Sequence, residues 1–218
     1  MKLLLGLLLF LITISCSNPI VYKPNSSFTF LVKNTKQNKN DTLILVVTND
    51  SWNVFQIKCI WKYSPIIDSL GSKTNITEMT GIVDKNYSFP FNMFFRSQIW
   101  LHPPRNVYLR MTELVPFPKI IFPIEQGQII PWSLTPKSGW GEFEGITIIG
   151  EIKIVDRILF NNPVFSDLCW VLEAHAESVI GSYKSKYYFH EKYGFVYLYY
   201  DFNDFQVELS LIEAKISK

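Results

Sequence analysis

Residues 139–213 constrain the fold of this chain most, because apolar and polar side chains alternate along successive segments of this stretch. Alternation with a period of two is typical of β-strands that bury one face. The stretch holds five or six such segments. Short turns join them, and one of these turns is formed by Asn161, Asn162 and Pro163. Consecutive strands with short connections pair antiparallel. We therefore predict an antiparallel β-meander.

Two segments show the alternation most clearly. Residues 146–159 predict a strand with a core face of isoleucines, at Ile146, Ile148, Ile152, Ile154 and Ile158. Residues 168–178 place Trp170, Leu172, Ala174 and Ala176 on one face, and Cys169, Val171, Glu173, His175 and Glu177 on the other. A sheet with so apolar an inner face must curl into a half-barrel or barrel, or be covered by a second layer.

The region before the meander predicts further strands and a loop-rich belt. Residues 28–32, 43–47 and 54–63 have strand patterns, and residues 49–51 carry a turn signal. Seven of the twelve prolines lie in residues 103–136. Proline lacks the donor that a sheet ladder needs, so most of this segment is expected outside the central sheet, as a loop-rich belt over one face or rim. We predict one mostly β domain over residues 28–218.

The N-terminus has the pattern of an export signal. Lys2 precedes an apolar run at residues 3–14, which suits a secretory leader better than a membrane span. Ser15 and Cys16 follow, and this junction resembles the lipobox of bacterial lipoproteins, although Thr13 stands where that family prefers leucine. The alternative is an ordinary secretory signal with an incidental cysteine.

The lipoprotein resemblance implies a leader over residues 1–15, a lipid-modified Cys16 and a tether over residues 16–27. In that family the cysteine carries diacylglyceryl on its sulfur and often an acyl chain, such as palmitate, on its amine. Two or three chains give lasting anchorage to a membrane. Ser17 is not the aspartate that retains family members in the inner membrane. We therefore expect a cell-envelope location, on the periplasmic face of the outer membrane.

Composition excludes some classes of partner. Charged residues make up 18% of the chain, and loss of the leader would leave 20 basic against 19 acidic side chains. A nearly neutral protein lacks the positive surface that nucleic-acid binding needs.

The titratable residues give little support for catalysis or for a cofactor. Glu173, His175 and Glu177 share one strand face and are weak metal candidates; a solvated outer face is the interpretation that we favour. His190 and Glu191 begin like a zinc-protease motif, but Gly194 stands where the second histidine is required. No nucleophile elbow, phosphate loop or dinucleotide fingerprint occurs. We predict no cofactor and no enzymatic activity.

Two cysteines other than Cys16 leave a choice open. Export would permit a disulfide between Cys59 and Cys169. Their predicted positions on opposite kinds of face favour two unpaired thiols.

Residues 169–211, with Tyr193, Gly194, Phe195 and Val196, resemble the closing hairpins of uncharacterised periplasm-facing lipoproteins. A curved sheet of this kind suggests a non-enzymatic envelope lipoprotein with two alternative roles. In the first, an apolar small molecule is bound by a concave lining, predicted at Trp170, Leu172, Ala174, Ala176, Phe195, Tyr197 and Tyr199. In the second, Trp100, Trp132 or Trp140 fills the concavity, and the protein acts through its surface in an envelope complex. A hydrolase is the third hypothesis.

Overall fold

The computed structural model describes residues 21–36, 39–53, 56–63, 79–84, 98–104, 109–137 and 140–217. Cys16 and the predicted leader lie outside these ranges. The described chain is mostly β-strand. It contains no α-helix, only the short 3-10 helices η1 (Arg110–Leu114) and η2 (Gly141–Phe143).

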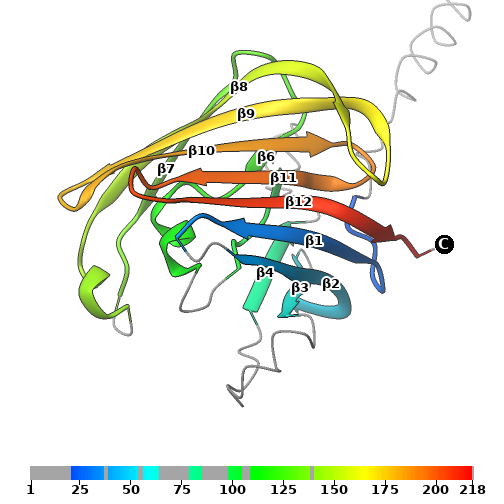
Figure 1. The fold of residues 1–218 in the computed structure, drawn as a ribbon, viewed down its shortest axis with the longest axis horizontal. Coiled ribbons are helices and arrows are strands. Elements are labelled where there is room, and N and C mark those ends of the chain that lie inside the picture. Colours follow the sequence, from blue (N-terminus) through cyan, green and yellow to red (C-terminus); the bar gives the residue numbers. More distant parts are fainter. Residues whose placement is uncertain are drawn as a thin grey trace, which may run out of the picture.

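One large antiparallel sheet forms the body of the protein (Figure 1). Its ten strands are β1 (Ser27–Asn34), β2 (Lys39–Asn53), β3 (Gln56–Tyr63), β4 (Met79–Asp84), β7 (Ile129–Leu134), β8 (Ile148–Asn161), β9 (Ser166–Ser178), β10 (Gly181–His190), β11 (Gly194–Asp201) and β12 (Gln206–Lys215). They follow the order β4-β3-β2-β1-β12-β11-β10-β9-β8-β7. The predicted fold class is therefore confirmed. In the described part of the chain the sheet is curved and open, with β4 and β7 at its edges.

Pairing of β1 with β12 joins the first and last strands at the middle of the sheet. The N-terminal strands thus extend the meander edge to edge instead of stacking on it. Period-two alternation then gives the sheet one continuous apolar inner face. This face includes Phe28, Phe30, Leu43, Leu45, Trp61, Ile152, Ile154, Leu172, Tyr187, Phe189, Leu198, Leu209 and Leu211, all fully or almost fully buried.

The proline-rich belt covers this inner face, as its composition predicts. Its strand β6 (Lys119–Ile121) pairs with β5 (Gln98–Trp100), which precedes the belt, in a separate two-stranded sheet, and Figure 1 shows β6 behind the strands of the meander. The belt adds buried Leu114, Val115 and Ile120 to the core, and Leu101 just before it is buried there too. Its last segment, β7, pairs with β8 at the sheet edge, where Pro131 is tolerated because an edge strand need not use every donor.

Two strand predictions are wrong because β-bulges interrupt the regular pattern. Strand β2 runs through residues 49–51, where a turn is predicted, and its register with β3 shifts between Val47 and Ser51. In β8 the register shifts between Ile154 and Asp156, so Val155 is an extra residue. The extra residue ends the inward alternation, and Ile158 is only half-buried.

The predicted tether also needs correction in its described part. Val21 and Tyr22 are buried, and the Tyr22 hydroxyl accepts a hydrogen bond from the Phe195 backbone N–H at 2.8 Å. Residues 21–26 therefore belong to the folded body, because an apolar pair and a buried Ser26 secure them there.

Candidate functional site

The residues predicted to line an apolar pocket do not form one lining. Leu172, Ala174, Ala176 and Phe195 are buried in the core. Trp170 is half-buried beneath the Arg157 guanidinium, 5.1 Å from its ring centroid. Tyr197 and Tyr199 are half-buried, and the Tyr197 ring stacks on Tyr188 at 4.8 Å.

The belt occupies the space that the small residues leave on the inner face. Gly150 is the register partner of Ala176, and a Cβ atom at Gly150 would lie 3.0 Å from Cγ of Pro116. The Tyr187 hydroxyl donates to the Pro116 carbonyl oxygen at 2.6 Å. Farther along the sheet, Trp61 Nε1 donates to the His102 carbonyl oxygen at 2.9 Å. The small side chains therefore admit the belt.

Two of the three tryptophans that we considered as fillers pack against the core. Trp132 and Trp140 are half-buried there. Trp100 stacks on Phe117 at 6.2 Å, and Phe117 in turn contacts Trp132 at 5.7 Å.

The three metal candidates on β9 point to solvent. Glu173, His175 and Glu177 are exposed, and Glu173 pairs with Lys186 at 2.8 Å. In the described part of the chain, no cluster of three or more histidine, cysteine or carboxylate side chains could hold a metal ion.

Cys59 and Cys169 are both free thiols and both buried. Burial raises the pKa of each thiol to about 12. The predicted polar setting of Cys169 is wrong, and so is that of Val171. Val171 is buried beside an aromatic cluster on the outer face, where Tyr188 is its register partner and packs against Phe160 at 5.0 Å. Cys169, the register partner of Ile158, belongs to the buried core.

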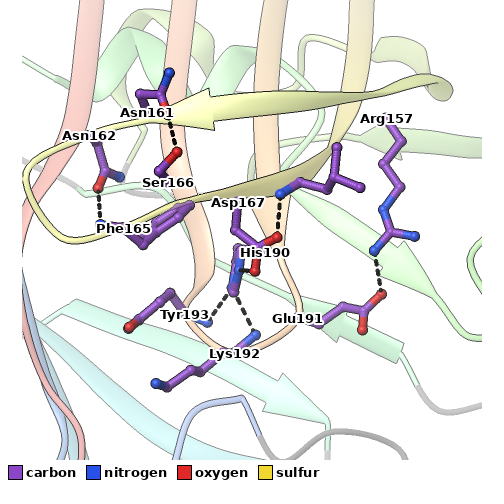
Figure 2. Close-up of polar contacts among 11 residues, drawn as sticks. Arg157, Asn161, Asn162, Phe165, Ser166, Asp167, His190, Glu191, Lys192 and Tyr193 are labelled. Carbon is purple, nitrogen blue, oxygen red and sulfur yellow. Dashed lines mark hydrogen bonds and ion pairs between the residues drawn. The ribbon is translucent and has the colours of Figure 1, made fainter.

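The described residues form a groove of about 500 Å³ at the end of the sheet where the turns β8–β9 and β10–β11 meet. Figure 2 shows this place from close by. The groove is lined by Lys23, Arg157, Asp167, Leu168, His190, Glu191, Lys192 and Ile216. It is the candidate functional site, because charged and apolar side chains from five separate segments of the chain converge there.

Local hydrogen bonds and ring stacking hold the two turns together. The Asn162 side-chain oxygen accepts hydrogen bonds from the backbone N–H groups of Val164 and Phe165, at 2.8 and 3.0 Å. This closes the β8–β9 turn, as asparagine commonly does. Phe165 then stacks on Tyr193 with ring centroids 5.0 Å apart and lies 4.5 Å from the His190 ring. One hairpin tip is thus fixed on the other.

Both ring nitrogens of His190 are engaged within the protein (Figure 2). Nδ1 accepts from the backbone N–H groups of Lys192 and Tyr193, at 3.0 and 3.3 Å. Nε2 therefore carries the proton and faces the Asp167 carboxylate at 3.3 Å. The N–H of Leu168 and the His190 ring lower the pKa of Asp167. A histidine general base needs a free lone pair directed at substrate, and here that lone pair is used by the turn.

The remaining charges nearly balance one another. Arg157 lies 3.6 Å from Glu191 and also covers Trp170. Lys192 Nζ lies 5.0 Å from the centroid of the Tyr193 ring. With Lys23, the groove has three cationic side chains against two carboxylates. Such a surface can contact charged and zwitterionic groups, and it holds no strong field of one sign.

Sequence reasoning considered His190 and Glu191 only as a failed protease motif and missed the groove. The signals that could have pointed to it are two turn sequences, at residues 161–163 and 191–194, each next to aromatic residues. The two turns meet because β9 and β10 are antiparallel neighbours, so the turn before β9 and the turn after β10 lie at the same end of the sheet.

In the described residues, no helix has the length and apolar character needed to cross a membrane. No protein-family model and no curated protein sequence matches this chain significantly.

Solved structures do match. A Bacteroides fragilis protein, described as exported and as having a YmcC-like fold, aligns with a TM-score of 0.50 and 14% identity over 92% of this chain and 100% of its own. A Parabacteroides distasonis protein described as a lipoprotein aligns with a TM-score of 0.52 and 9% identity, again over 92% and 100%. The hypothetical lipoprotein YmcC of Escherichia coli K12 aligns with a TM-score of 0.42 and 11% identity over 90% of each chain. At such identities the first two likenesses show the fold alone, and that fold is the one called YmcC-like.

Proposed function

We propose that this protein is a non-enzymatic, lipid-anchored protein of the bacterial cell envelope that acts through its outer surface. The observation that carries the role is the filled inner face, where Pro116 of the belt lies against Gly150 and receives the Tyr187 hydroxyl. A carrier of apolar molecules needs an open concavity at this place. The proposed role is therefore that of an interaction subunit in an envelope complex.

The chemistry of the groove agrees with a non-enzymatic role. His190 has both ring nitrogens occupied, Nε2 by Asp167 and Nδ1 by the turn. Arg157 is engaged by Glu191 and Trp170. These side chains serve to join two hairpin tips, and none presents a free base or nucleophile.

The envelope location rests first on Lys2, the apolar run and the Ser15–Cys16 junction. The neighbours with this fold agree with it, since one is described as exported and another as a lipoprotein. Ser17 in place of aspartate favours the outer membrane, with the domain on the periplasmic face.

We expect native mass spectrometry of the detergent-purified protein to give the mass of the chain with its lipid anchor and no additional apolar ligand. The reason is that side chains of the belt already fill the inner face. A lipid or other apolar molecule that co-purifies at one copy per chain would overturn the filled-core role and support a carrier. Turnover in a hydrolase screen that is abolished by one point substitution would overturn both the filled-core role and the carrier role.

Metabolic labelling with a clickable fatty acid should label the wild-type protein and should not label the variant C16S. The expected loss is complete, because the acyl chains are attached through this residue in lipoproteins. The variant should also leave the membrane fraction, since each buried methylene contributes about 0.8 kcal/mol to anchorage. Label that persists in C16S would contradict the proposed anchor. C59S is a matched control that should keep the label, because Cys59 is buried in the core.

A further inference from the structure

The described chain enters the folded body at the groove. Tyr22 is held against β11 by its bond to the Phe195 N–H, and the next residue, Lys23, lines the groove. Gly194 lies so close to Tyr22 that a Cβ atom there would collide with the ring. The point at which the chain leaves toward Cys16 is thus fixed beside the β10–β11 turn.

The distance from that point to the proposed anchor is short. Cys16 precedes Val21 by five residues. A fully extended chain spans at most about 3.6 Å per residue, so Cys16 lies within about 18 Å of Val21. A membrane that holds the acyl chains of Cys16 must therefore pass close to this end of the sheet, whatever path the five residues take.

The same end carries exposed apolar side chains next to cationic ones. Leu159 and Leu168 are register partners across β8 and β9, and they are 62% and 43% exposed. Leu168 lines the groove together with the cationic Lys23 and Lys192. Apolar side chains that enter the boundary of the acyl region, beside lysines that reach lipid phosphates, are typical of surfaces that rest on a membrane.

We propose that the groove end of the sheet docks onto the lipid surface that holds the anchor, with Leu159 and Leu168 entering the interface and Lys23 and Lys192 contacting lipid phosphates. This inference rests on the proposed lipid anchor and adds an orientation to it. The sheet then stands on its groove end and presents its opposite end to the periplasm.

The opposite end supplies a matched control. The β9–β10 turn lies there, and it too carries exposed apolar residues, Val179 and Ile180, which are 90% and 39% exposed. Leu168 and Ser178 stand ten residues apart on β9. At about 3.3 Å per residue they are separated by roughly 33 Å, far beyond the depth of an interfacial contact. A difference in lipid contact between positions 168 and 180 therefore cannot be explained by exposure alone.

The test uses the full lipoprotein in vesicles of phosphatidylethanolamine and phosphatidylglycerol that contain lipids spin-labelled near the headgroup. The variants L168C and I180C are labelled with the fluorophore NBD. The unsubstituted protein serves as the background, because Cys59 and Cys169 are buried. We expect the vesicle lipids to quench NBD strongly at position 168 and only at background level at position 180. In L168C, the further changes K23E and K192E should reduce the quenching.

Flotation of the same samples separates the two proposals. Protein that floats with the vesicles but shows equal, low quenching at both positions would overturn the docking and leave the anchor in place. Stronger quenching at position 180 would also overturn it, since the opposite end would then face the lipid. Protein that does not float would overturn the anchor and the docking together.

Discussion

The substitution I152D is expected to lower the free energy of unfolding by about 3–5 kcal/mol, because it places an unpaired charge in the core. Ile152 is completely buried, between Ile130 of β7 and Ala174 of β9. Neither neighbour offers a hydrogen bond or a counter-charge. Typical total stabilities are about 5–15 kcal/mol, so this one change should consume a large share of the stability. Urea unfolding followed by tryptophan fluorescence would measure it.

The adjacent position gives the control. Lys153 is exposed, and K153D should cost less than about 1 kcal/mol, the cost arising from its new like-charge neighbour Glu173 across the strand pair. Equal losses for the two variants would contradict the inward orientation of Ile152 and, with it, the register of β8.

G194A should be the second strongly destabilising change. Gly194 has a φ of +76°, and a Cβ atom there would collide with the Tyr22 ring. The left-handed conformation costs a non-glycine residue about 1–2 kcal/mol. Overpacking against a buried ring adds about 1–3 kcal/mol. The same unfolding measurement should therefore show a loss that combines both costs.

Gly145 allows the two costs to be separated. Its φ of +77° is nearly identical, but no atom lies within 4 Å of the Cβ position. G145A should show only the conformational cost, of about 1–2 kcal/mol. The double variant Y22A/G194A should lose less stability than the sum of the losses in Y22A and G194A, because Y22A removes the ring that the new Cβ meets. Equal losses for G145A and G194A would mean that Tyr22 does not lie against the β10–β11 turn.

Local patterns in the sequence were enough to predict the meander. The alternation around Ile152, Leu172 and Tyr187 specifies which side of each strand is buried, and a one-residue slip would expose that whole side. The prolines of residues 103–136 likewise predicted a belt that lies mostly outside the central sheet, since a missing donor is a local property; only β7 joins the sheet, at its edge. The bulges in β2 and β8 escaped prediction because an extra residue disturbs a ladder only through its partner strand.

The sequence by itself thus determined a mostly β, antiparallel chain with an apolar inner face and an exposed face at Glu173, His175 and Glu177. Only the tertiary structure decided what covers each face. It seats Pro116 against Gly150, buries Cys169 near the aromatic cluster, and brings Asp167 to His190 and Lys23 to the β10–β11 turn. These contacts join residues far apart in the chain. Hydrophobic periodicity specifies which side of a segment is buried, but the partner that buries it is chosen by the packing of the whole molecule.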